Sequence, residues 1–118
     1  MRNFRELDIW NLSRDLVKEV YLLMKSMPDE EKFGLTSQIK RSAVSIPSNI
    51  AEGCAKKSNK DFSRFLEISL GSCYELETQL ILCSDLELIS EKLIIEKIEL
   101  TQTIEKKITS FIKYLSTQ

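Results

Sequence analysis

Apolar residues recur at every third or fourth position along nearly the whole chain, and this spacing constrains the fold more than any other feature. Such spacing gathers the apolar side chains on one face of an α-helix. Only three glycines and two prolines interrupt the 118 residues. We therefore expect long helices joined by short turns, in one domain that covers residues 1–118.

Four segments carry the helical pattern. They run from about Leu7 to Ser26, from the turn after Met27-Pro28 to about Gly53, from Ser58 or Asn59 to about Leu86 or Leu88, and onward from a cap at Ser90. Short connections between helices of this length predict an all-α fold, an antiparallel up-down four-helix bundle. The first helix has two adjacent apolar stripes, a face wider than a two-helix contact needs, which favours a further partner surface.

A proline interrupts the second segment, in the stretch RSAVSIPSNIAEG (residues 41–53). Pro47 lacks a backbone donor and its ring crowds the carbonyl of residue 43, so we expect the second helix to be kinked near Pro47. The apolar spacing continues in phase on both sides, which favours one bent helix over two. Gly53 is the expected end of that helix.

A polar stripe runs beside the apolar face of the second helix: Gln38, Ser42, Ser45, Asn49 and Glu52. Its small side chains permit close helix approach, so helix packing is the favoured interpretation and a ligand groove the alternative. The third segment offers Gly71, Ser72 and Glu75 as a counterpart. A hairpin about residue 56 would set Arg41 near Gly71 and Glu75, which predicts a partly buried Arg41–Glu75 ion pair.

The net charge of −1 hides an uneven distribution of charge along the chain. Between Glu67 and Glu99 there are eight acids and two lysines. Between Lys40 and Arg64 six basic residues face only Glu52 and Asp61. Solvated helix faces are the favoured interpretation, and an anion-binding patch is the alternative. The candidate nucleic-acid contacts are Arg41, Lys56, Lys57, Lys60 and Arg64.

Residues suited to catalysis or metal binding are sparse. The chain has no histidine, the commonest general base and metal ligand. Cys54, Cys73 and Cys83 form no pair at metal-ligand spacing and are expected to be reduced thiols. The sequence predicts no enzyme, no cofactor and no metal site. Short apolar runs predict no membrane span, and an N-terminus without a signal peptide predicts a cytoplasmic protein.

Two stretches resemble a known family: GLTSQIKRSAVSIPSNIAEG (residues 34–53) and FLEISLGSCYELETQL (residues 65–80). They are similar to the bacterial 23S rRNA intervening-sequence proteins, also called four-helix bundle proteins. The resemblance implies a left-handed bundle that assembles into a ring-like homopentamer, with no established catalytic residues. The residues that match the family's motifs are Gln38, Arg41, Ser45, Asn49, Glu52, Gly53, Gly71, Ser72 and Glu75.

Two functions follow from these observations. The first is a non-enzymatic homo-oligomer, expected to be a pentamer, that associates weakly with RNA or another nucleic acid, or with a nucleic-acid-processing protein. The alternative is a structural adaptor that docks a protein partner without binding nucleic acid. Base stacking is not expected beside the lysines, because Phe62 and Phe65 are predicted to lie in the core.

Overall fold

Four long helices form the computed structural model, which describes residues 2–118. They are α1 (Asp8–Met24), α2 (Leu35–Cys54), α3 (Asn59–Asp85) and α4 (Glu91–Ser116), with short 3-10 helices at Phe4–Glu6 (η1) and Asp29–Glu31 (η2). Among the described residues there is no strand. The predicted all-helical fold with four helices is confirmed.

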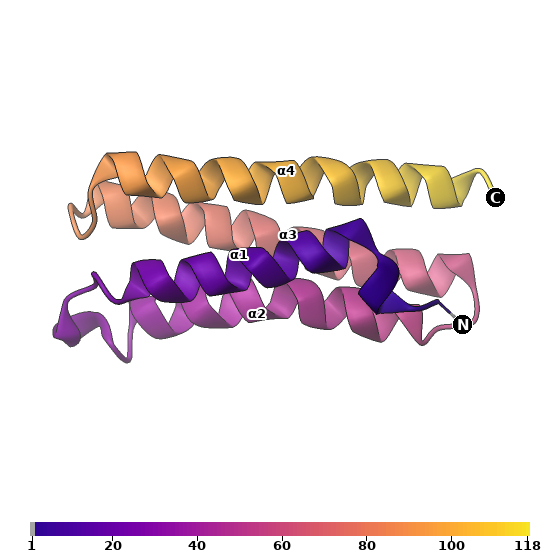
Figure 1. The fold of residues 1–118 in the computed structure, drawn as a ribbon, viewed down its shortest axis with the longest axis horizontal. Coiled ribbons are helices and arrows are strands. Elements are labelled where there is room, and N and C mark those ends of the chain that lie inside the picture. The colour runs from indigo at the N-terminus through magenta and orange to yellow at the C-terminus, as the bar shows by residue number, and fades with distance from the viewer. Residues whose placement is uncertain (1) are drawn as a thin grey trace.

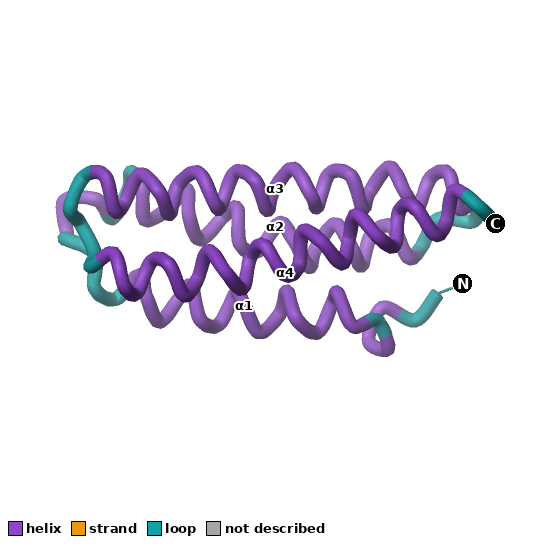
Figure 2. Tube along the Cα trace, turned by 90° about the horizontal axis from the view of Figure 1, so that it is seen from above, coloured by secondary structure: helices purple, strands orange, loops and turns teal. Residues whose placement is uncertain are grey.

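The helices lie along one long axis, and the molecule measures 46 × 21 × 19 Å (Figure 1). Both termini and the α2–α3 turn lie at one end, while the α1–α2 and α3–α4 connections lie at the opposite end (Figure 1). Figure 2 shows the same arrangement from above, with the loops confined to the two ends. Each charged side chain in a connection therefore lies at one end of the molecule or the other.

The helix bounds agree with the sequence expectations to within a few residues. Ser58 is the N-cap of α3, and its hydroxyl accepts a hydrogen bond from the Asp61 amide at 3.1 Å. Ser90 is the N-cap of α4, although its side chain makes no capping bond. Helix α2 continues through Pro47 as one helix, as the uninterrupted apolar phase indicated. A bend at Pro47 stays a prediction.

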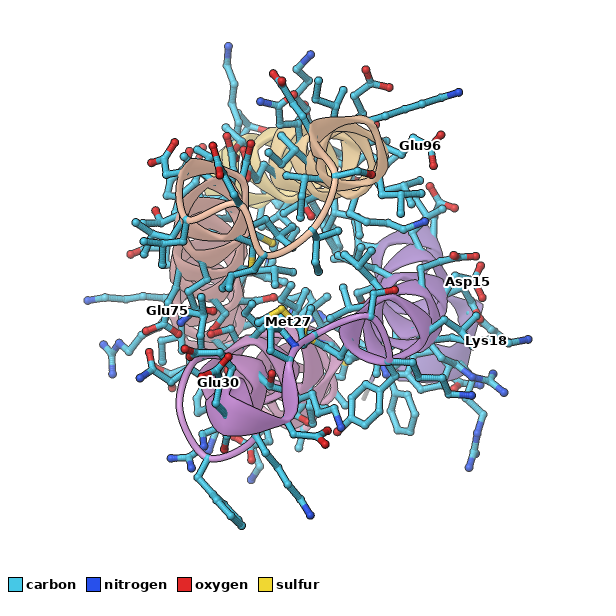
Figure 3. All side chains as sticks on the ribbon, turned by 90° about the vertical axis from the view of Figure 1, so that its left-hand side faces the viewer. Asp15, Lys18, Met27, Glu30, Glu75 and Glu96 are labelled. Atoms are coloured by element: carbon cyan, nitrogen blue, oxygen red, sulfur yellow. The ribbon has the colours of Figure 1, made fainter. Side chains whose placement is uncertain are left out.

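The core lies between the four helices and is built from the residues of the repeating apolar pattern. Met27 points to the middle of the molecule, whereas Asp15, Lys18, Glu30, Glu75 and Glu96 lie at its periphery (Figure 3). The largest side chains of the core are fully buried: Leu16, Val20, Ile39, Ile46, Ile50, Phe62, Leu66, Leu76, Leu80, Ile94, Ile104 and Ile108. Burial of such side chains is the main favourable contribution to folding.

Gly53 allows the end of α2 to approach α3 closely. A Cβ atom at this position would lie 2.8 Å from the Phe65 Cβ and 2.9 Å from the Phe62 ring. Helix α2 ends at Cys54, so the expected end near Gly53 is confirmed to within one residue, but Gly53 is not a left-handed cap, because it does not adopt a positive φ. The absence of a side chain at residue 53 is needed for packing rather than for a left-handed cap.

Gly71 has the opposite surroundings, although it belongs to the same family motif. It is exposed in the middle of α3, and a Cβ added there would meet no atom within 4 Å. Gly71 therefore does not make room for a neighbouring side chain within the chain. Its helical position costs about 0.5–1 kcal/mol relative to alanine without a visible compensating contact.

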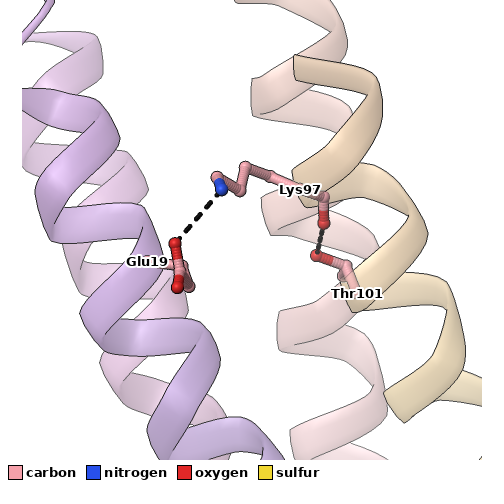
Figure 4. A network of polar contacts seen from close by, with 3 residues as sticks. All are labelled: Glu19, Lys97 and Thr101. Atoms are coloured by element: carbon pink, nitrogen blue, oxygen red, sulfur yellow. Dashed lines mark hydrogen bonds and ion pairs between the residues drawn. The ribbon is translucent and has the colours of Figure 1, made fainter. Parts of the chain in front are cut away.

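An ion pair joins α1 to α4. The Lys97 ammonium lies 3.2 Å from the Glu19 carboxylate, and the Thr101 hydroxyl donates to the Lys97 carbonyl at 2.8 Å (Figure 4). The Lys97 side chain is 14% exposed, so the pair is less screened by solvent than an ordinary surface pair. It holds the first and last helices together.

Between α3 and α4 lies a carboxyl pair, Glu77 and Glu105. Burial, together with the neighbouring Glu77 carboxyl group, raises the pKa of Glu105 to about 8, and Lys106 opposes the rise. The Oε2 atom of Glu105 is buried without a hydrogen-bond partner, while Gln102 donates to Glu77 at 3.2 Å. Glu105 is therefore mostly neutral at pH 7 in the folded chain.

The two glycines give a matched pair of substitutions. Gly53→Ala should destabilise the fold by about 1–3 kcal/mol, because the new methyl group overlaps the Phe62 and Phe65 side chains. Gly71→Ala should stabilise it by about 0.5–1 kcal/mol, since the site is open and helical. Urea unfolding followed by circular dichroism measures both. A loss of stability in Gly71→Ala would contradict the open surroundings of that residue.

The carboxyl pair makes stability depend on pH. From pH 4.5, the ordinary value, to about 8, the unfolded chain releases a proton from residue 105 that the folded chain retains. Stability should therefore fall as pH rises through this window. Glu105→Gln should remove this fall, and the exposed Glu99→Gln serves as the control. Urea midpoints at pH 5, 7 and 8.5 measure the effect. An unchanged decline in Glu105→Gln would contradict this origin.

Candidate functional site

The polar stripe of α2 packs against α3 through hydrogen bonds between small side chains. The Ser42 hydroxyl donates to the Glu75 carboxylate at 2.7 Å, and the Ser45 and Ser72 hydroxyls lie 2.8 Å apart. The Asn49 amide donates to the Ser45 carbonyl and hydroxyl, both at 2.9 Å. These residues therefore connect two helices. Gln38 and Glu52, at the two ends of the stripe, are exposed.

Arg41 does not form the expected ion pair with Glu75. Among residues 2–118 no salt bridge joins them, and the Glu75 carboxylate accepts the Ser42 hydroxyl instead. Successive helical residues differ by about 100° in direction, so Ser42 faces α3 while Arg41 is exposed. Arg41 and Glu75 do line the same open hollow of about 450 Å³ beside the contact between α2 and α3.

The candidate nucleic-acid contacts separate into two places. Lys56 and Lys57 lie in the α2–α3 turn, Lys60 and Arg64 follow in the first turns of α3, and all four are exposed. Arg41 lies about 20 Å from the C-terminal end of α2, measured along the helix. The four residues at the turn form one cluster, and Arg41 belongs to another part of the surface.

The N-terminal segment adds a cation that sequence reasoning missed. The Arg2 guanidinium donates to the Lys56 carbonyl at 3.0 Å, hydrogen-bonds Asn59, and lies 4.3 Å from the centroid of the Phe62 ring. No local pattern could reveal this, because Arg2 lies 54 residues from Lys56 in the sequence. We call Arg2, Lys56, Lys57, Lys60 and Arg64 the basic cluster.

Charges of opposite sign gather at the two ends of the molecule. The end that carries the basic cluster also holds the C-terminal turns of α4, which contain Lys106, Lys107 and Lys113 (Figure 1). The opposite end holds more acids than bases. The acids of the two connections and the helix turns beside them are Asp29, Glu30, Glu31, Asp85, Glu87 and Glu91, and the lysines there are Lys25, Lys32 and Lys92. The net charge of −1 therefore conceals a separation of charge along the long axis.

Some charges at the basic end already have partners. Arg64 lies 3.8 Å from Asp61, in a pair whose side chains are 64% and 50% exposed. Lys107 lies 3.0 Å from Asp8 and connects α4 to α1. Exposed pairs of this kind hold their partners weakly. They leave Lys57 and Lys60 as exposed cations beside the N-terminus of α3, whose dipole also favours an anion.

The three cysteines are poor nucleophiles. Cys54, Cys73 and Cys83 are buried free thiols. Burial raises the pKa of Cys73 to about 12, with Glu105 and Glu77 contributing, and burial also raises the pKa of Cys54 and of Cys83. Because the thiolate is the reactive form, these side chains serve packing.

Two further kinds of site are absent from residues 2–118. No group of three or more histidine, cysteine, aspartate or glutamate side chains there is arranged to hold a metal ion. None of the helices in this range has the length and apolar character needed to cross a membrane.

Comparisons with known proteins agree with this architecture. The chain is similar to a crystal structure from Bacteroides thetaiotaomicron VPI-5482, described as a protein of unknown function from the S23 ribosomal protein family. The TM-score is 0.83 at 30% identity, over 89% of this chain and 98% of that one. The search of curated proteins gave no match. The family model of the 23S rRNA-intervening sequence protein matches residues 5–110, so the chain belongs to that family.

Proposed function

We propose that the chain is a non-enzymatic protomer of a cytoplasmic homo-oligomer, a pentamer of antiparallel up-down bundles, that associates weakly with RNA through the basic cluster. The observation that carries the proposal is the gathering of Arg2, Lys56, Lys57, Lys60 and Arg64 at one end of the molecule. Family membership agrees with an RNA-related role.

Electrostatics make this end the preferred place for a phosphate backbone. Lysine and arginine side chains bind nucleic acid by releasing the counterions that surround its phosphates, without regard to sequence. The acids of the opposite end repel the same backbone, so an RNA would approach end-on. One cluster of this size binds weakly, and several copies on one ring would bind together more strongly.

Self-association is supported by apolar side chains that the single chain leaves in water. Most of them lie on α3 and α4: Ile68, Tyr74, Ile81, Leu82, Leu86, Leu93, Ile95, Leu100 and Tyr114. Exposed apolar surface of this extent is typical of a protein interface. We call these side chains the α3–α4 surface and assign the contacts between copies to it. Ile81 and Ile95 lie at the centre of the assigned contact.

An adaptor that docks another protein is the second candidate function. The same α3–α4 surface favours it, because exposed leucine and isoleucine side chains can bind a partner's apolar face. The two functions differ in their response to salt, since phosphate binding weakens steeply with salt while apolar docking does not.

Sedimentation equilibrium tests self-association. The expected mass is near five times the 13.7 kDa chain. Ile81→Ser combined with Ile95→Ser should lower that mass, because both side chains are more than 40% exposed beside the α3–α4 turn. Tyr21→Ser, which removes an exposed ring from α1, is the control. A mass of 13.7 kDa at every protein concentration would contradict the oligomer.

Titration with a structured RNA hairpin at several salt concentrations tests the basic cluster. Lys57→Ala combined with Lys60→Ala should weaken binding and lower the slope of log affinity against log salt by roughly 0.7–0.9 for each contact removed. The charge-matched control is Lys25→Ala combined with Lys92→Ala, at the opposite end. Absence of binding at low salt, or equal effects of the two pairs, would favour the adaptor.

A further inference from the structure

Two shallow hollows meet on the face formed by α1 and α2. The first, of about 660 Å³, is lined by Tyr21, Phe33, Lys40 and Arg41 among others. The second, of about 390 Å³, contains Phe4, Trp10 and Arg14. Val44 lines both, so the hollows adjoin at this residue, and we call the two together the α1–α2 groove.

Each aromatic ring of the groove has a cation over it. The Lys40 ammonium lies 4.9 Å from the centroid of the Tyr21 ring, and the Lys32 ammonium lies 5.5 Å from that of Phe33. Towards the N-terminus the Arg14 guanidinium carbon lies 5.4 Å from the centroid of the Trp10 ring. Positive charge and aromatic surface therefore alternate along the groove rather than occupying separate regions.

Acidic side chains are absent from the lining of both hollows, although Glu30 and Glu31 directly precede Lys32 in the chain. The acids of α1 lie elsewhere, since Asp15 and Glu19 line a separate hollow between α1 and α4. Arg14, Lys18 and Tyr21 follow one another at spacings of four and three residues, which places them on one side of α1. On α1, the cations therefore lie on the side of the groove with α2, and Asp15 and Glu19 lie on the side of α4.

The rings at one end of the groove are open to solvent. Phe33 is 90% exposed and Tyr21 is 42% exposed. The ring of an exposed phenylalanine makes no hydrogen bond with water, and its two faces can stack on another planar group. At the other end the plane of the Arg14 guanidinium offers a similar stacking surface.

We propose that the α1–α2 groove binds single-stranded RNA. Bases stack on Tyr21, Phe33 and the Arg14 plane, while Lys32, Lys40 and Arg41 contact the intervening phosphates. Alternation of stacking rings and cations is the arrangement by which proteins bind single strands without sequence preference. This assignment rests on the proposed RNA partner but places it at a second site, distinct from the basic cluster.

Charge and layout favour this occupant over others. A paired RNA duplex keeps its bases stacked inside and cannot offer them to Tyr21 or Phe33. The part of the groove where the hollows meet is apolar and includes Val17, Val44 and Pro47, as a second copy or an amphipathic partner helix would need. The cations over the rings at both ends favour an anionic occupant instead. Here a cation lies over each exposed ring, and the groove lining carries positive charge only.

The test compares Tyr21→Ser combined with Phe33→Ser against the control Leu22→Ser, which removes an exposed apolar side chain from α1 outside the groove. The probes are a fluorescein-labelled oligouridylate of about 12 nucleotides and a labelled RNA hairpin. The groove variant should lose at least about tenfold in affinity for the single strand, given about 1–3 kcal/mol for each stacked base. Its affinity for the hairpin should not change.

The chain's single tryptophan provides an independent readout, because Trp10 lines the groove. Its fluorescence should be quenched by the oligouridylate in the wild type and in the control variant. Quenching should persist after Lys57→Ala combined with Lys60→Ala, and this separates the groove from the basic cluster.

Three results would overturn the assignment. An unchanged single-strand affinity in the groove variant, with a loss only in the lysine pair, would leave the basic cluster as the RNA site. A reduced sedimenting mass in the groove variant would mean that a second copy covers the groove. Absence of binding to either probe would reject the groove and the proposed function together.

Discussion

The close approach of α2 and α3 is the constraint on which the rest of the structure depends. It requires a residue without a side chain at Gly53, where any Cβ would overlap Phe62 and Phe65. Along the same contact, Ser42 and Ser45 of α2 hydrogen-bond to Glu75 and Ser72 of α3. The Ser69 hydroxyl of α3 donates to the Ile46 carbonyl of α2 at 2.9 Å. The contact is therefore tight at one end and polar along its length, which fixes the register of the two helices as well as their distance.

That register decides where the charges lie. Because α2 and α3 are joined by a short turn, Lys56, Lys57 and Lys60 are carried to one end of the molecule. Arg2 reaches the same end and hydrogen-bonds the Lys56 carbonyl. The acids of the other two connections are carried to the opposite end. A chain with almost no net charge thereby acquires a positive end that a phosphate backbone can recognise.

Individual residues show how far sequence reasoning reaches. The pairing of the Ser42–Ser45–Asn49 stripe with α3 follows from helical spacing, because small residues on one stripe permit close packing. Spacing could not decide between Arg41 and Ser42 as the partner of Glu75, since a rotation of one residue changes which side chain faces the neighbour. Gly53 and Gly71 have the same identity and opposite surroundings, and only the packed neighbours distinguish them. The raised pKa of Glu105 likewise depends on burial beside Glu77.

The sequence by itself determined the local structure: four helices, their approximate bounds, the apolar faces and an N-cap at Ser58 or Asn59, of which the structure uses Ser58. These depend on residues within one or two turns of each other, so the pattern is visible in the chain. Tertiary structure decided what lies side by side across long sequence separations. It brought Arg2 to Lys56, set Glu77 beside Glu105, and placed Lys40 of α2 over the Tyr21 ring of α1. Such contacts depend on the relative rotation of packed helices, which side-chain complementarity across the whole core determines.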